Sequence, residues 1–226
     1  MAQIVTHKND EPMFGSSPLI KHAREHTFPA IMYEMFSGKR PNQNELELFD
    51  LILNLSIDHG EDTPSAKATV ISAKAGSSMG GAVGDGVKMI NEKHGGATEP
   101  AMHMFYAMGK NKSLAKNIVN DCLCEKKRIP GFGHRLYEED PRAELILETI
   151  ERLKFPNTYC NFARALEVEL AKSVPDKTLP LNIDGAIAVA LCTFQWEPRA
   201  STAVFIAARA AGLCAHYLNT TQESGE

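Results

Sequence analysis

The chain has 226 residues, of which 43% are hydrophobic and 23% are charged, and its formal net charge is −4. This composition is typical of an ordinary globular protein and excludes intrinsic disorder for most of the chain. The slightly acidic balance argues against a general nucleic-acid binder, because such proteins neutralise phosphates with an excess of Lys and Arg.

The five cysteines form no Cys-x-x-Cys pair, so we expect reduced thiols that pack as small hydrophobic side chains and no metal site. His22 and His26 are four residues apart but lack the neighbouring glutamate of a zinc protease. Residues 1–12 lack the apolar core of a signal peptide, and the apolar run 202–218 is too short to cross a bilayer. These features predict a soluble cytoplasmic protein.

Apolar periodicity, caps and breakers predict helices along almost the whole chain. No run with period-2 alternation exceeds four or five residues, so strands are not expected. Residues 76–81 are interpreted as a glycine-rich helix breaker and 219–226 as a frayed polar tail. The predicted fold class is therefore all-α, with helices over residues 18–36, 44–57, 64–75, 82–91, 101–108, 113–125, 141–153, 161–172, 184–193 and 199–218.

The first motif that a plain helical bundle does not explain is His94-Gly95-Gly96, just before a helix that opens at Thr98. Glycines let the backbone approach another group closely, and the positive end of the helix dipole disfavours a charged imidazole. His94 is therefore predicted to be a neutral hydrogen-bond donor. The alternative is a helix-entry loop with a surface histidine.

The second motif is Pro130-Gly131-Phe132-Gly133, followed by His134. Such a loop exposes backbone amides and carbonyls to a ligand and makes His134 project from a sharply turned backbone. The alternative interpretation is a hinge between helices.

Asp184, in Asn182-Ile183-Asp184-Gly185, precedes an apolar helix. It is either the cap of that helix or a functional carboxylate at a joint between two parts of the fold. Arg209 lies in an alanine-rich helix, where an anionic partner is favoured because the alanines give its side chain little apolar surface to follow. His59 follows the most hydrophobic helix, and the favourable interaction of a histidine with the helix dipole could alone explain its presence there.

Together these motifs resemble the citrate synthase superfamily from about Phe28 to Leu218. Residues 182–186 and 212–218 look most like citryl-CoA lyases and the citryl-CoA-cleaving module of ATP-citrate lyase. The resemblance is carried, in chain order, by Asp58-His59-Gly60, His94-Gly95-Gly96, Gly131-Phe132-Gly133-His134-Arg135, Asp140-Pro141-Arg142, Asn182-Ile183-Asp184 and Arg209.

The resemblance implies a homodimer, or a higher oligomer, of subunits with two helical domains and an active-site cleft between them. The large domain is expected to comprise residues 1–96 plus 189–226, and the small domain residues 97–188.

The resemblance also implies three catalytic residues, His94, His134 and Asp184. Asp184 would exchange a proton with the methyl group of acetyl-CoA, while His94 donates a hydrogen bond to the developing enol oxygen. His134 would exchange a proton with the oxygen on C2 of oxaloacetate.

For substrate binding, the resemblance implies that His59, Arg142 and Arg209 hold the dicarboxylate through charge-assisted hydrogen bonds. Coenzyme A would be held by Pro130, Gly131, Phe132, Gly133 and Arg135. It is part of the substrate, and no separate cofactor or metal is expected.

One feature departs from the citrate synthase pattern. Citrate synthases use a further arginine from the partner subunit, beyond the equivalent of Arg209, and the last residues of this chain contain none. Its contact would be absent or supplied by Arg40, Arg128 or Arg135. This departure favours a lyase, whereas the histidine of the His-Gly-Gly motif favours synthase chemistry.

The sequence therefore predicts a citryl-CoA lyase that forms acetyl-CoA and oxaloacetate. The first alternative is a citrate synthase condensing acetyl-CoA with oxaloacetate or a related 2-oxo acid. The second is a weakly active assembly subunit of a citrate-activating enzyme.

Overall fold

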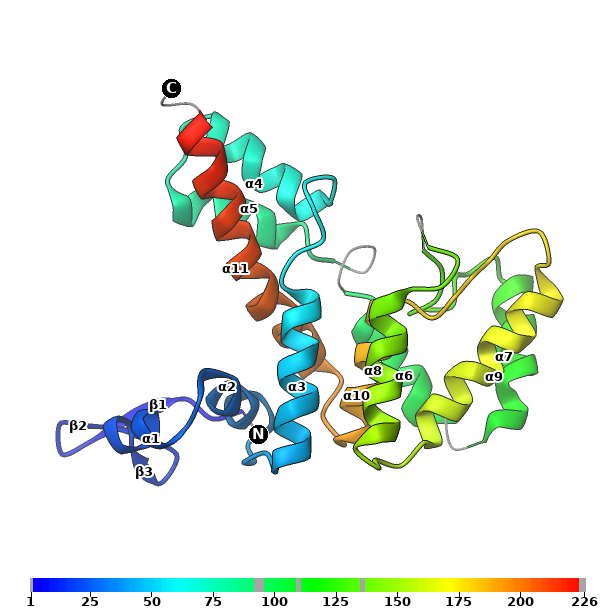
Figure 1. Cartoon of the computed structure of the whole chain (residues 1–226), viewed down its shortest axis with the longest axis horizontal. Coiled ribbons are helices and arrows are strands. Elements are labelled where there is room, and N and C mark those ends of the chain that lie inside the picture. Colours follow the sequence, from blue (N-terminus) through cyan, green and yellow to red (C-terminus); the bar gives the residue numbers. More distant parts are fainter. Residues whose placement is uncertain (1, 92–95, 109–110, 135–136, 224–226) are drawn as a thin grey trace. The chain divides into compact units, whose positions relative to one another are not determined.

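The computed structural model describes residues 2–91, 96–108, 111–134 and 137–223 (Figure 1). Its internal contacts divide the chain into one unit of residues 1–51 and a second unit of residues 52–226. The predicted division into residues 1–96 plus 189–226 and residues 97–188 stays a prediction.

The first unit begins with a small antiparallel sheet of three strands, β1 (Val5–Lys8), β2 (Glu11–Phe14) and β3 (Ser17–Pro18). Asn9 and Asp10 connect β1 to β2 with φ angles of 51° and 62°. Two successive positive φ angles are the signature of a tight hairpin turn, and Asn and Asp tolerate them better than most residues. This small sheet was not foreseen from the sparse strand signals in the sequence, whereas the predicted all-α class is confirmed by the helices that follow.

The single helix expected over residues 18–36 is two helices, α1 (Leu19–Glu25) and α2 (Phe28–Ser37). The chain is extended at His26 and Thr27, and Pro29 lies in the first turn of α2. Proline fits a first turn because it lacks an N–H group, but it breaks a continuous helix. Helix α3 (Gln43–Ser56) follows and carries fully buried Leu48, Phe49 and Ile52.

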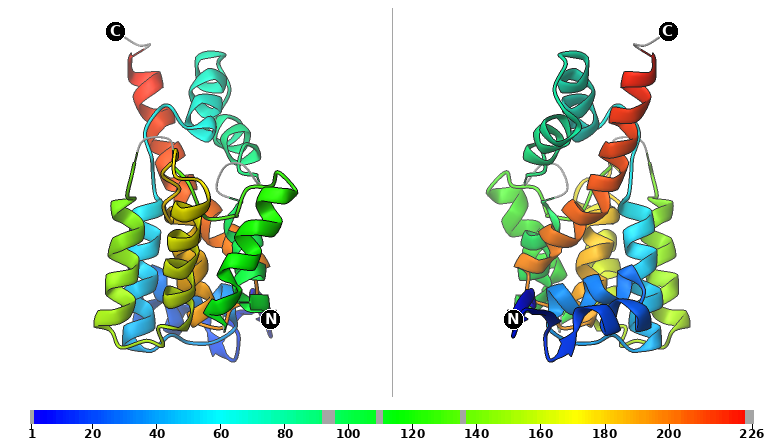
Figure 2. Two further views of the ribbon diagram at one scale, coloured as in Figure 1. Left: turned by 90° about the vertical axis from the view of Figure 1, so that its right-hand side faces the viewer. Right: turned by 90° about the vertical axis from the view of Figure 1, so that its left-hand side faces the viewer.

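The second unit contains eight α-helices within the described residues. Helices α4 (Pro64–Lys74), α5 (Met79–Lys88) and α11 (Arg199–Glu223) pack against one another, as the two side views also show (Figure 2). Helix α5 begins inside the stretch predicted to be a breaker, because the Ser78 side chain caps it by accepting from the Gly81 N–H. Helix α11 extends beyond its predicted end at Leu218.

The remaining helices of this unit surround α10 (Ile183–Thr193), which packs against α6 (Thr98–Met108), α8 (Pro141–Arg152) and α9 (Thr158–Ser173). A 3-10 turn (Lys112–Leu114) leads into α7 (Ala115–Cys124), which packs against α9. Nearly every residue of α10 is buried, as expected for a helix that is apolar all round.

The cap of α10 is Asn182, whose side-chain oxygen accepts the Gly185 N–H. The capping interpretation of Asp184 was therefore wrong. Within the described ranges, none of the helices has the length and apolar character needed to span a bilayer.

The contact of α5 with α4 and α11 depends on Gly86. A Cβ atom at this position would lie 2.8 Å from the Ser65 carbonyl oxygen and 2.8 Å from Leu213 Cδ1, and even closer to the Thr69 hydroxyl. Gly84, on the same helix, has open space around it. The glycine at position 86 is therefore required by close packing between helices.

We predict that Gly86→Ala lowers the free energy of unfolding by about 1–3 kcal/mol, because the methyl group would overpack the helix contact. Gly84→Ala is the matched control and should raise that free energy by about 0.5–1 kcal/mol, because alanine favours the helical state. Urea denaturation of the two variants measures the difference. Equal effects of the two substitutions would contradict this account of the packing.

Candidate active site

A small cavity of about 120 Å³ lies in the second unit. Its volume is that of about four water molecules, so it suits a small polyatomic ligand rather than a nucleotide. Five of the predicted site residues meet here from four separate segments of the chain. The lining residues are Leu55, Ser56, His59, Thr63, His134, Arg142, Asn182, Ile183, Asp184, Phe205 and Arg209.

Arg142 is held in the cavity wall by Asp140, a fully buried residue. The Arg142 guanidinium donates from Nε to Asp140 Oδ1 at 2.9 Å and from Nη2 to Oδ2 at 2.8 Å. Burial alone would raise the pKa of Asp140, but Arg142 outweighs it and holds that pKa below its usual value. The two-point contact fixes the plane of the guanidinium and leaves its other edge toward the cavity.

His59 lies 3.3 Å from Arg142, measured between His59 Nδ1 and Arg142 Nη1. A guanidinium only donates, so His59 Nδ1 accepts and the proton of the neutral ring lies on Nε2. Burial, followed by the charge of Arg142, lowers the pKa of His59 and keeps the ring neutral. His59 therefore provides a neutral N–H donor.

His134 Nε2 lies 3.3 Å from Arg142 Nη2, and its Nδ1 accepts the backbone N–H of Tyr137 at 3.2 Å. A neutral imidazole has only one nitrogen without a proton, so these two contacts require different tautomers. The ring also stacks on Tyr137, with centroids 4.4 Å apart. The Arg142 guanidinium and the Tyr137 N–H are both donors, so each neutral tautomer of the ring can accept from only one of them.

Arg209 is only 2% exposed. Its Nε donates to the Ser56 carbonyl at 3.0 Å, and its guanidinium lies 4.9 Å from the centroid of the Phe205 ring. Its Nη1 is buried and has no hydrogen-bond partner among the described residues. A buried guanidinium nitrogen in a cavity wall can donate to an anion, and the anionic partner of Arg209 stays a prediction.

The carboxylate in this cavity belongs to Asp184, on the first turn of α10. Its Oδ1 is buried and has no hydrogen-bond partner within the described part of the chain. Burial raises the pKa of Asp184 to about 6, although Arg142, Arg209 and the Thr98 hydroxyl all act to lower it. A carboxyl group with such a pKa can exchange a proton near neutral pH.

A larger cavity of about 820 Å³ adjoins the first. His59, Thr63, His134, Asn182 and Asp184 line both cavities. The remaining wall includes the predicted loop, Pro130 to Gly133, and two cations. These are Arg128, one of the three alternative arginines, and Lys67, which was not predicted as a site residue. A cavity of this volume accommodates an organic ligand of cofactor size.

Close backbone packing places the loop 130–133 beside the start of α10. A Cβ atom on Gly131 would lie 2.6 Å from Gly185 Cα, so neither position tolerates a side chain without movement. The Asn182 N–H donates to the Gly131 carbonyl at 3.0 Å, and Asn182 Nδ2 donates to the Gly133 carbonyl at 2.9 Å. Asn182 therefore both caps α10 and fixes the loop.

The structure brings together His59, His134, Arg142, Asp184 and Arg209, and places residues 130–133 in the adjoining wall. His94 and Arg135 lie outside the described residues. Of the three alternative arginines, Arg128 lines the larger cavity, whereas Arg40 lies 3.5 Å from Glu34 in the first unit. The sequence analysis missed the site roles of Asn182 and Asp140, although Asp140 precedes Pro141 as a helix cap would.

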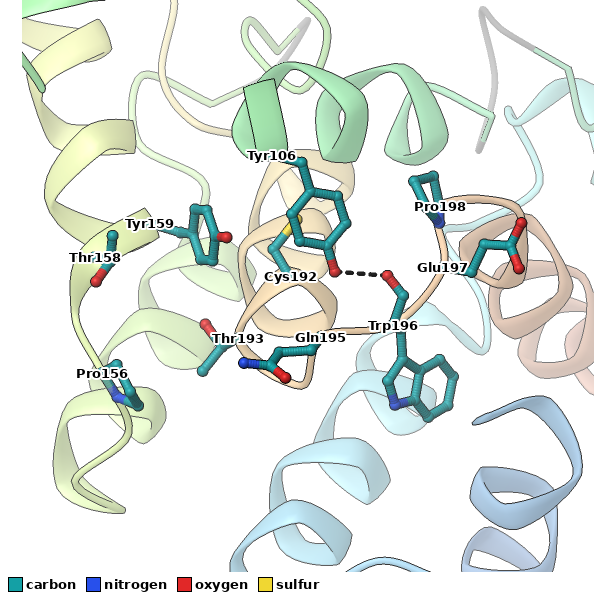
Figure 3. A pocket seen from close by; sticks show the side chains of 10 residues that line it. All are labelled: Tyr106, Pro156, Thr158, Tyr159, Cys192, Thr193, Gln195, Trp196, Glu197 and Pro198. Carbon is teal, nitrogen blue, oxygen red and sulfur yellow. Dashed lines mark hydrogen bonds between the residues drawn. The ribbon is translucent and has the colours of Figure 1, made fainter. Parts of the chain in front are cut away.

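Another cavity, of about 630 Å³, lies at the opposite end of α10 between Tyr106, Tyr159 and Trp196 (Figure 3). The Tyr106 hydroxyl donates to the Trp196 carbonyl at 2.6 Å and links α6 to the segment before α11. Glu197 is the charged residue in its wall, and none of the described lining residues is Lys, Arg or His. This cavity therefore suits anionic ligands less well than the two cavities around Asp184.

Comparison with known proteins supports the resemblance found in the sequence. The family model "Citrate synthase, C-terminal domain" matches residues 1–225. A citrate synthase of Heyndrickxia coagulans is 27% identical over 212 residues, which are 93% of this chain and 57% of that protein. A probable ATP-citrate synthase subunit 1 of Neurospora crassa is 28% identical over 94% of this chain and 34% of its own length. The chain thus spans between one third and three fifths of these two curated relatives.

Among solved structures, a citryl-CoA lyase from Hydrogenobacter thermophilus superimposes with a TM-score of 0.89 and 32% identity. The match covers 97% of this chain and 86% of that protein. The family model and this structural neighbour both extend over almost the whole chain. This chain belongs to the citrate synthase family.

Proposed function

We propose that this chain cleaves citryl-CoA to acetyl-CoA and oxaloacetate. The observation that carries the proposal is the position of Asp184, a carboxyl group of raised pKa that lines both a small cation-walled cavity and a larger cavity. A C–C bond between a diacid and a thioester would lie at this junction. The 32% identity to a citryl-CoA lyase supports this choice within the family.

The small cavity matches the oxaloacetate part of the substrate. Arg142 and the unpartnered Nη1 of Arg209 provide positive charge, and neutral His59 provides a further N–H donor. A dicarboxylate would satisfy the buried guanidinium of Arg209, which otherwise costs free energy. We therefore assign substrate binding to His59, Arg142 and Arg209.

The larger cavity matches the coenzyme A part. The backbone of Pro130, Gly131, Phe132 and Gly133 can offer hydrogen bonds to the nucleotide, and Lys67 and Arg128 can meet its phosphates. Arg135 remains a proposed contact, because it lies outside the described residues. Coenzyme A enters as part of the substrate, and the proposed reaction needs no further cofactor.

The cleavage follows from these positions. His134 takes the proton of the citryl hydroxyl, and that oxygen becomes the C2 carbonyl of oxaloacetate as the C–C bond breaks. The bonding electrons move into the thioester to form an enolate, to whose oxygen we assign His94 as hydrogen-bond donor. Asp184 then gives its proton to the terminal carbon and completes acetyl-CoA.

Cleavage requires Asp184 to begin the cycle protonated, which an aspartate with an ordinary pKa near 4 would rarely be at neutral pH. Burial therefore prepares this residue for the proposed direction. Condensation begins instead with Asp184 ionised and His134 protonated. These two residues therefore carry the same number of protons at the start of either direction, and only the position of the proton differs.

Citrate synthase activity is the second candidate, because a citrate synthase is 27% identical over 93% of this chain. An assembly subunit with little activity is the third. The discriminating experiment incubates the protein with citryl-CoA and, separately, with acetyl-CoA plus oxaloacetate. A lyase forms acetyl-CoA from the first mixture. Release of free CoA from the second mixture at a matching rate would contradict the lyase assignment.

Asp184→Asn should lower the turnover of citryl-CoA by at least ~100-fold, because an amide cannot donate the proton that the enol carbon requires. Steady-state kinetics at saturating citryl-CoA measures this loss. Asp121→Asn, at an exposed position on α7, is the matched control and should leave turnover unchanged. Unaltered turnover in Asp184→Asn, or none in the unmodified protein, would favour the assembly subunit.

The same substitution should stabilise the fold at neutral pH. The pKa of Asp184 rises on folding from its ordinary value of 3.8 to about 6, so folding favours the protonated form. The unmodified protein therefore loses stability as the pH rises between these two values and carries the full cost above them. In Asp184→Asn no ionised carboxylate has to be buried, so the free energy of unfolding should rise by up to ~3 kcal/mol at pH 8.

Thermal melting between pH 4 and pH 8 tests this expectation. The Tm difference between Asp184→Asn and the unmodified protein should be small at pH 4 and grow toward pH 8. A difference independent of pH would show that Asp184 titrates normally in the folded state.

A further inference from the structure

Thr98, the first residue of α6, has a buried polar group that the mechanism above does not use. Its side chain is fully buried, and its Oγ1 has no hydrogen-bond partner among the residues that the structure describes. A buried hydroxyl group without a partner loses its hydration and gains nothing in return. The presence of a hydroxyl group at this buried position, despite its cost in stability, therefore has to be explained.

Helices α6 and α10 pack against each other. Near their first turns, Ala101 and Gly185 both contact Gly131, since a Cβ atom there would lie 3.4 Å from Ala101 Cβ and 2.6 Å from Gly185 Cα. Further along α10, the Cys192 thiol donates to the Met102 carbonyl at 3.8 Å, and the Tyr106 hydroxyl donates to the Trp196 carbonyl, just after α10. Thr98 and Asp184 therefore both lie in the first turns of two helices that pack against each other.

Both first turns belong to the candidate site. Ala97 and Pro100, which flank Thr98 in the sequence, line the larger cavity together with Asp184. The Thr98 hydroxyl acts to lower the pKa of Asp184, although Thr98 Oγ1 and Asp184 Oδ1 make no hydrogen bond among the described residues. The orphaned hydroxyl thus faces the reacting carboxyl group.

The two orphaned atoms are complementary. Thr98 Oγ1 carries a proton to donate, and Asp184 Oδ1 is buried without a donor among the described residues. The other charged groups that act on this carboxyl are Arg142 and Arg209, which attract it, and Asp140, which repels it. His59 and His134 face it across the cavity.

We propose that Thr98 is a positioning residue whose hydroxyl donates to Asp184 Oδ1 and so leaves Oδ2 to exchange the proton with the substrate carbon. This inference rests on the proposed function. The hydrogen bond restricts rotation about the Cβ–Cγ bond of Asp184, which would otherwise let either oxygen face the substrate. It also favours the ionised carboxylate over the protonated form, because a hydroxyl donor strengthens its bond to a negative charge.

The test compares Thr98→Val, which keeps the shape but removes the hydroxyl, with Thr98→Ser, which keeps the hydroxyl. Thr98→Val should lower kcat for citryl-CoA cleavage by about tenfold, while KM stays within about twofold, because the carboxyl loses its orientation but the substrate contacts remain. Thr98→Ser should stay within about threefold of the unmodified kcat. Equal losses in both variants, or no loss in Thr98→Val, would overturn the proposal.

The second readout does not depend on catalysis. Removing the hydroxyl should raise the pKa of Asp184 in the folded state, so the upper end of the pH range over which the protein loses stability should move upward by about one pH unit, while its lower end stays in place. Melting curves of Thr98→Val and Thr98→Ser between pH 4 and pH 8, each also in the Asp184→Asn background, measure this shift. A shift in Thr98→Val that disappears with Asp184→Asn supports the proposal, and its absence refutes it.

These outcomes separate the two proposals. An unmodified protein that does not cleave citryl-CoA contradicts the proposed function, while the melting curves still decide whether Thr98 acts on Asp184. An active protein that is inactivated by Asp184→Asn, but has the same pH dependence with Val or Ser at position 98, retains the proposed function and loses only the positioning role.

Discussion

The carboxylate of Asp140 connects the parts of the site that lie on separate segments. It binds the Arg142 guanidinium at two points, and its Oδ2 also accepts the Ile183 N–H at 3.1 Å, at the start of α10. One fully buried group therefore aligns a cation of the small cavity and the helix that carries Asp184. A buried ion pair adds little net stability, but losing one partner would leave the other charge uncompensated. Its value here is the fixed geometry that it imposes.

The charged side chains of the site differ in whether a partner of opposite charge neutralises them. Arg142 has a carboxylate partner, whereas Arg209 is buried with one unpaired nitrogen and Asp184 with one unpaired oxygen. Unpaired buried groups destabilise the protein without ligand and become favourable interactions once a complementary substrate fills the cavity. The features that reduce the stability of the fold are therefore the ones that would bind and convert the substrate.

Several features were predictable because they depend on neighbours in the sequence. Caps, glycines and apolar periodicity located the helices to within a few residues, apart from the break at Pro29 and the early start of α5. The alanine-rich surroundings of Arg209 indicated a need for an anion, and its unpartnered Nη1 agrees with this. The hairpin at Asn9-Asp10 was missed, although two turn-forming residues between short segments were a usable signal.

The sequence by itself determined the helical class, the family resemblance and the residue types of the site, because these are properties of local pattern and motif order. Only the tertiary structure decided which of these residues share a cavity, since Asp140, Thr98 and Asp184 are brought together by the packing of α8 and α6 against α10 and not by their spacing in the sequence. The raised pKa of Asp184 likewise depends on burial, which no window of sequence around it specifies. The pKa that lets Asp184 exchange a proton thus depends on how the helices pack, whereas the identities of the donor and acceptor side chains are given by the sequence.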